Sequence, residues 1–123
     1  MTGSFPLAYP LAWPENVART EVRKSHGPAM SISSAVASLK DILALWAAEN
    51  ASRLSDVVIS SNVTLGEAMP ADPGVVLYFK IDGNPSHLLC DRFLRPEQNV
   101  RGIYEQIEAR RAASNRRYQD SSA

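Results

Sequence analysis

One segment decides the fold, GVVLYFKIDGNPSHLLC, which spans residues 74–90. Residues 74–81 are rich in β-branched and aromatic side chains, which favour a strand. Asp82 and Gly83 follow, and both tolerate the positive φ that a two-residue type I′ turn requires. Residues 86–90 then return as a second strand, so the segment predicts a β-hairpin.

A two-residue turn also fixes which hairpin side chains share a face. One face is uniformly apolar and is predicted to be the core side: Val75, Leu77, Phe79, Leu88 and Cys90. The other face places Tyr78 opposite His87. It is too apolar to face water, so we expect the N-terminal arm or a partner to cover it.

Helical patterns flank the hairpin. Apolar residues at three- and four-residue steps over 36–46 predict an amphipathic helix. Ser33 or Ser34 is expected to cap its start, and Asn50 is expected to end it. Proline suits the first turn of a helix, so Pro96 predicts the start of a second one.

The second helix carries an apolar stripe and is predicted to end at about Ala113. A β-branched run over 56–63 predicts a third strand. The expected fold class is therefore α+β. It is a two-layer fold with a three-stranded antiparallel sheet packed against two helices, in the order arm–α–β–β–β–α.

Residues 1–34 are predicted to form a proline- and aromatic-rich arm. They hold four of the eight prolines, which fix φ and lack a donor N–H. Their alternating apolar residues are expected to bury one side on the domain, whereas the polar stretch 19–28 is expected to be mobile. The α+β domain then covers 35–113, and 114–123 forms a flexible polar tail.

Composition narrows the class of protein. A chain of 123 residues with 45% hydrophobic residues supports one domain. Thirteen basic and thirteen acidic residues give no net charge, which excludes a wholly basic nucleic-acid-binding coat. No apolar run approaches the roughly 20 residues that span a bilayer, no secretory signal is expected from the first residues, and a single cysteine suits the cytoplasm.

Few residues are of a catalytic type, and we expect no enzyme activity and no cofactor. His87, Cys90, Asp91 and Arg92 are clustered in sequence and suggest at most a small hydrolase-like site. However, His87 and Cys90 are an odd number of residues apart on one strand, so they point to opposite faces. No spacing typical of a metal site occurs, and no metal is expected.

Positive charge gathers near the C-terminus. Between residues 92 and 117, seven arginines face three glutamates, a surplus of four positive charges. Arginine binds phosphate through two parallel hydrogen bonds, so a nucleic-acid-binding accessory function is the alternative hypothesis. Its candidate residues are Arg101, Arg110, Arg111, Arg116 and Arg117.

Several short motifs follow one another in a definite order over residues 8–112. They are Tyr9-Pro10-Leu11-Ala12-Trp13-Pro14, Arg19-Thr20, Val57-Val58-Ile59-Ser60, Asp72-Pro73-Gly74-Val75, Tyr78-Phe79, Cys90-Asp91-Arg92 and Asn99. In this order the chain resembles a family of small uncharacterised bacterial and phage proteins, in the region before the J domain of its J-domain-containing members. The resemblance implies a phage or mobile-element origin. A J domain acts through a His-Pro-Asp tripeptide, which this sequence lacks, so co-chaperone activity is not implied.

The leading hypothesis is therefore a non-enzymatic, phage- or mobile-element-encoded protein-binding module. The absence of a catalytic constellation and the apolar second face of the sheet favour it. Its candidate partner-binding residues are Tyr9, Trp13, Tyr78 and His87. We expect a protein partner in the cytoplasm, with no membrane association, and the hypothesis is compatible with a homo-oligomer.

Overall fold

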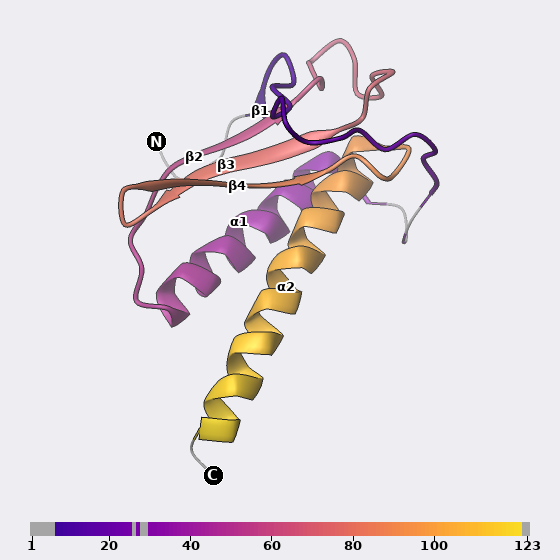
Figure 1. Cartoon of the computed structure of the whole chain (residues 1–123). Coiled ribbons are helices and arrows are strands. Elements are labelled where there is room, and N and C mark those ends of the chain that lie inside the picture. Colours follow the sequence, from indigo (N-terminus) through magenta and orange to yellow (C-terminus); the bar gives the residue numbers. More distant parts are fainter. Residues whose placement is uncertain (1–6, 26, 28–29, 122–123) are drawn as a thin grey trace.

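The computed structural model describes residues 7–25, 27 and 30–121, with side chains described as far as Ser114. Two helices lie on one face of a single sheet (Figure 1). The elements in chain order are β1 (Leu7–Ala8), α1 (Ile32–Glu49), β2 (Leu54–Ser61), β3 (Val75–Ile81), β4 (Asn84–Cys90) and α2 (Pro96–Ser121). The α+β class is confirmed.

The sheet differs in one respect from the predicted one. It has four strands in the order β1-β2-β3-β4, and it is mixed because β1 pairs in parallel with β2. Leu7 lies opposite Ile59 and Ala8 opposite Ser60. The prediction of three antiparallel strands is therefore wrong at this edge. The extended arm, which proline keeps from being helical, supplies a short strand to the open side of β2.

The hairpin matches the prediction pair by pair. Leu77 lies opposite Leu88 and Val75 opposite Cys90. The two turn residues have positive φ, 53° at Asp82 and 81° at Gly83, as a type I′ turn requires. The local chemistry of two residues thus sets the register of the whole hairpin.

The first helix begins earlier than predicted. Ser31, not Ser33 or Ser34, is the N-cap, and its hydroxyl oxygen accepts a hydrogen bond from the Ser34 N–H at 3.0 Å. Such a cap satisfies one of the N–H groups that a helix start leaves unpaired. Asn50 caps the C-terminal end, as expected.

The strand predicted at 56–63 lies at Leu54–Ser61, and its pairing with β3 is irregular between Ser55 and Val58. The second helix continues to Ser121, beyond its predicted end near Ala113. In Figure 1 this last part of α2 extends away from the sheet.

The core lies between the sheet and the helices. It contains the predicted face of the hairpin together with the apolar stripes of both helices. Its fully buried side chains include Leu39, Leu43, Ile59, Leu77, Ile103 and Ile107. Burial of this contiguous apolar surface is the main stabilisation of the fold.

The N-terminal arm lies on the opposite face of the sheet, which the arm or a partner is predicted to cover. The Leu11 N–H donates to Asn62 Oδ1 at 2.9 Å, and the Ala12 N–H donates to Ser60 Oγ at 2.7 Å. The Tyr78 hydroxyl donates to the Ala12 carbonyl. Val76 is fully buried on this face.

Candidate functional site

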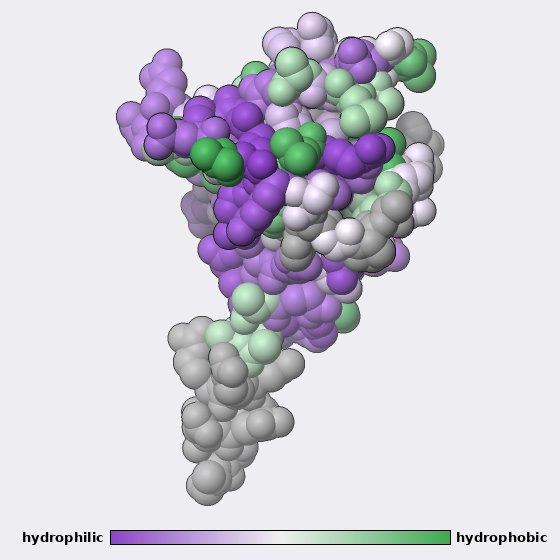
Figure 2. All heavy atoms as spheres, turned by 90° about the vertical axis from the view of Figure 1, so that its right-hand side faces the viewer, coloured by the Kyte–Doolittle hydropathy of each residue, from purple (hydrophilic) through white to green (hydrophobic). Residues whose placement is uncertain are grey.

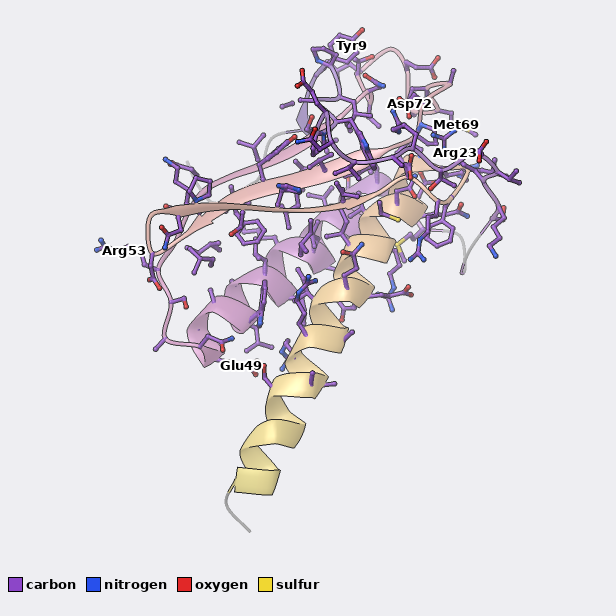
Figure 3. All side chains as sticks on the ribbon, viewed as in Figure 1. Tyr9, Arg23, Glu49, Arg53, Met69 and Asp72 are labelled. Carbon is purple, nitrogen blue, oxygen red and sulfur yellow. The ribbon has the colours of Figure 1, made fainter. Side chains whose placement is uncertain are left out.

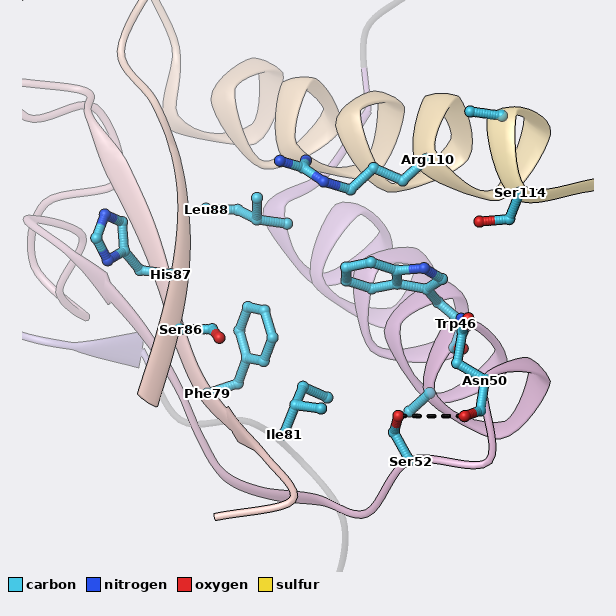
Figure 4. A pocket seen from close by; sticks show the side chains of 12 residues that line it. Trp46, Asn50, Ser52, Phe79, Ile81, Ser86, His87, Leu88, Arg110 and Ser114 are labelled. Atoms are coloured by element: carbon cyan, nitrogen blue, oxygen red, sulfur yellow. Dashed lines mark hydrogen bonds between the residues drawn. The ribbon is translucent and has the colours of Figure 1, made fainter. Parts of the chain in front are cut away.

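An open groove lies between the hairpin end of the sheet and the C-terminal halves of the helices (Figure 4). Its volume is about 600 Å³, within the range typical of ligand sites. Most of its wall is apolar, from Trp46, Phe79, Ile81 and Leu88, and its polar residues include Asn50, Ser52, Ser86, Arg110 and Ser114. No carboxylate lines it among the residues that are described.

Two aromatic rings form the centre of the wall. Trp46 lies in the last turns of α1 and Phe79 near the end of β3. Their ring centroids are 6.5 Å apart and the planes meet at 69°, an edge-to-face contact. Phe79 is buried, whereas Trp46 is only half-buried, so one side of the indole remains open to the groove.

Arg110 supplies the positive charge. Its side chain reaches from α2 across the groove toward Leu88 on β4 (Figure 4). It is exposed and forms no ion pair with any described carboxylate. An unpaired guanidinium beside apolar walls is suited to an anionic group of a ligand.

The neighbouring arginine has a structural role instead. Arg111 binds both oxygens of Glu49 through Nε and Nη2, each at 2.8 Å, and Glu108 through Nη1 at 2.9 Å. These hydrogen bonds raise the pKa of Arg111 and lower that of Glu49. Arg111 therefore joins α2 to the end of α1, where Figure 3 labels Glu49.

The other candidate phosphate-binding arginines are not brought together. Arg101 lies 3.7 Å from Glu105, and its guanidinium stacks over the Tyr104 ring at 4.3 Å. Arg116 and Arg117 fall outside the side chains that the structure describes. Of the five predicted arginines, Arg110 is thus the one described without an ion pair.

The predicted partner-binding residues lie on the arm side of the sheet. The rings of Tyr78 and His87 are neighbours, with centroids 5.9 Å apart, and burial raises the pKa of Tyr78. His87 is exposed and lies at the edge of the groove, but its ring turns to the other side of β4 (Figure 4).

The two arm aromatics of that set differ in their contacts. The Trp13 indole N–H donates to the Val17 carbonyl at 2.9 Å, and the Arg19 guanidinium lies 4.5 Å from its ring centroid. Trp13 therefore packs within its own chain, whereas Tyr9 is 64% exposed. Of the four candidates, Trp13 and Tyr78 thus already form contacts with arm residues of their own chain.

A buried carboxylate fixes the arm in place. Asp91 is 3% exposed and accepts hydrogen bonds from Arg19 Nε at 2.8 Å, from the Thr20 N–H at 2.9 Å and from the Thr20 hydroxyl at 2.6 Å. Arg23 donates to the Asp91 carbonyl at 2.7 Å, and Arg19 also binds Asp72. We call these five residues the arm clamp. Figure 3 shows Arg23 and Asp72 at the same end of the sheet.

Within the polar stretch 19–28, which is predicted to be mobile, Arg19, Thr20 and Arg23 are hydrogen-bonded to the domain, whereas residues 26 and 28 lie outside the described residues. Lys24 continues the contact, since its N–H donates to the Arg92 carbonyl and its own carbonyl accepts from the Leu94 N–H. Burial alone raises the pKa of Asp91, but the hydrogen bonds from Arg19 and Thr20 outweigh it and hold the pKa below its usual value.

The residues considered for hydrolysis do not form a chain of nucleophile, base and carboxylate. The carboxylate of Asp91 is occupied by the clamp, and Arg92 is exposed, 5.6 Å from the Phe93 ring centroid. Within the described chain, His87 forms no hydrogen bond to Asp91. Cys90 is buried, which raises its pKa, and its thiol donates to Asn99 Oδ1 at 3.3 Å.

In the part of the chain that is described, no three His, Cys, Asp or Glu side chains lie close enough together to hold a metal ion. No described helix is long and apolar enough to cross a membrane. On the surface shown in Figure 2, hydrophobic areas are small and separated by hydrophilic ones.

Sequence reasoning missed the groove because its residues were assigned to the core. Trp46 continues the apolar stripe of α1, and Phe79 belongs to the core face of the hairpin. Periodicity places both on the inner side. It does not reveal that the helices and the sheet diverge at this end.

Comparison with family models, with curated proteins and with solved structures finds no match to this chain. The resemblance to proteins associated with J domains therefore stays a prediction.

Proposed function

We propose that this chain is a non-enzymatic protein-binding module and that a segment of its partner binds in the groove. The observation that carries the proposal is the half-buried Trp46 beside Phe79, in an open groove of about 600 Å³. Tryptophan is enriched among the residues that dominate binding energy at protein interfaces. A half-covered indole gives a partner side chain an apolar surface that the fold itself leaves open.

The groove is a better binding surface than the second face of the sheet. The arm covers part of that face, where Val76 is fully buried and the Tyr78 hydroxyl donates to the Ala12 carbonyl. The helix side retains an open apolar wall at its hairpin end. The binding surface is therefore proposed on the helix side, with Tyr9 and His87 as exposed residues outside its centre.

Selection from a random peptide library tests the proposal. Peptides would be displayed in two formats, one embedded between flanking sequences and one with a free C-terminus. Enriched peptides are then measured against Trp46→Ala and against Leu45→Ala. Leu45 is the matched control, since it is an exposed apolar residue on the same helix that does not line the groove.

We expect enriched peptides to retain affinity for Leu45→Ala and to lose about tenfold or more with Trp46→Ala, the loss typical of a dominant interface residue. Urea unfolding of each variant checks that the domain remains folded. If no peptide is enriched in either format, or if the enriched peptides are indifferent to Trp46, the proposal is wrong.

A further inference from the structure

The groove has an apolar part and a positively charged part. Trp46, Phe79 and Ile81 form an apolar wall, while Arg110 approaches from α2 toward Leu88 (Figure 4). The nearby carboxylates of Glu49 and Glu108 are both bound by Arg111. An occupant must therefore offer an apolar group to the wall and an anion to Arg110.

The C-terminal end of α1 determines at which end of the groove an anion would bind. A helix C-terminus carries partial negative charge, and α1 ends at Asn50 in the wall of this groove. The Asn50 side-chain amide donates to the Trp46 carbonyl at 2.8 Å, and the N–H groups of Asn50, Ala51 and Ser52 donate to the last carbonyls of the helix, so these donors are already used and offer nothing to an anion. An anion is therefore disfavoured near Asn50 and favoured at the Arg110 end.

The polar partners along the wall are few. Apart from His87, whose ring turns to the other side of β4, the uncharged polar residues that line it are Asn50, Ser52, Ser86 and Ser114, and the Ser52 hydroxyl donates to the Asn50 carbonyl at 3.3 Å (Figure 4). An internal peptide segment that crosses an apolar groove must find partners for the N–H and C=O groups on both sides of the bound residue. A chain end brings one peptide group and its own carboxylate, so it leaves fewer groups without partners.

From these observations we infer that the groove binds the C-terminal residue of a partner protein, with an aliphatic or aromatic side chain on Trp46 and the terminal carboxylate on Arg110. The inference rests on the proposed function and names the kind of segment that is bound. Charge complementarity selects the anion, and the scarcity of polar partners selects a terminus over an internal carboxylate.

The test uses N-acetylated pentapeptides with the last two positions randomised, prepared as free acids and as C-terminal amides. Peptides retained by the full chain are identified and then titrated by tryptophan fluorescence in a Trp13→Phe background, in which Trp46 is the one remaining tryptophan. We expect the retained acids to end in Leu, Ile or Phe, and the matching amides to bind about tenfold more weakly, as for loss of a charge-assisted hydrogen bond.

Two variants address Arg110 without cutting into the core. Ser114→Glu places a carboxylate four residues from Arg110 on the same side of α2, so it competes with the ligand for the guanidinium. Its control is Ala112→Glu, because Ala112 is exposed and points away from Arg110. Arg110→Gln is paired with Arg53→Gln, since Arg53 is exposed and does not line this groove.

We expect Ser114→Glu and Arg110→Gln to reduce acid binding to the level of the amides, and the controls to leave it unchanged. Equal binding of acids and amides, with dependence on Trp46, would refute the carboxylate contact and leave the proposed function standing. If only peptides embedded between flanking sequences bound, the claim that the groove binds a C-terminal residue would be refuted. The absence of binding to both pools, self-association through the groove or displacement of the acids by a single-stranded oligonucleotide would each overturn the inference.

Discussion

Replacing Asp91 with alanine tests the account of how the arm is held. The carboxylate is buried and accepts three short hydrogen bonds from Arg19 and Thr20. A net contribution of about 1 kcal/mol for each bond gives a loss of about 3 kcal/mol in the free energy of unfolding. Arg19 is 36% exposed and keeps its contact with Asp72, so no additional penalty for an isolated buried charge is expected.

Urea unfolding followed by circular dichroism measures the free energy. Asp41→Ala is the control, because Asp41 is an exposed acidic residue of α1. Limited trypsin digestion gives a local measurement, since cleavage after Arg19 or Arg23 requires the arm to leave the domain. We expect this cleavage to be slow in the wild-type protein and in Asp41→Ala, and fast in Asp91→Ala.

The reasoning would be refuted by one combination of results. If Asp91→Ala unfolded within about 0.5 kcal/mol of the control, the range of ordinary surface substitutions, and trypsin cleaved both at the same rate, the clamp would not hold the arm.

Two other predictions concern acid stability and packing. The pKa of Asp72 is lowered chiefly by its hydrogen bond from Arg19, and that of Asp91 is also lowered, so both carboxylates stabilise the fold at neutral pH. This stabilisation is complete above the unfolded-state pKa of about 4 and is lost as the pH falls through the lower folded-state values, which urea unfolding at several pH values measures. Gly102→Ala would place a Cβ 2.6 Å from Cys90 Sγ, so we expect a net loss of about 1 kcal/mol and a lower Tm despite the better helix propensity of alanine.

The acid-stability prediction and the Gly102→Ala prediction can each be contradicted by one result. Acid sensitivity that persists unchanged when both carboxylates are replaced by amides would assign it to other groups. An unchanged Tm for Gly102→Ala would mean that α2 and β4 move apart at little cost.

The hairpin could be predicted from sequence because its determinants are local. Asp82 and Gly83 select the turn, and alternation along two strands then fixes every pair from Val75 to Cys90. The first turn of α2 is similarly local, since Pro96 suits that position. In both cases the deciding residues lie close together in the chain.

The arm clamp and the fourth strand depend on contacts between distant residues. Arg19 and Asp91 are 72 positions apart, and Leu7 pairs with Ile59. No spacing or periodicity connects such residues in one sequence. The two motifs that contain Arg19 and Asp91 were visible as features of the resemblance, but their mutual contact was not.

The candidate site was only partly predictable for the same reason. The local surplus of arginines identifies Arg110 as a candidate binding residue, although for nucleic acid rather than for a protein partner. Trp46 was placed on the inner face of its helix, as its position in the stripe requires. The groove arises from the divergence of helices and sheet, which is a property of the assembled layers.

The clamp also has a consequence for the order of events during synthesis. A ribosome adds about 5–20 residues per second, so roughly 4–14 s separate the appearance of Arg19 from that of Asp91, 72 residues later. During this interval the arm has left the ribosome without its buried partner. The arm can therefore be fastened only after β4 is complete, and the sheet face beneath it stays open to water until then.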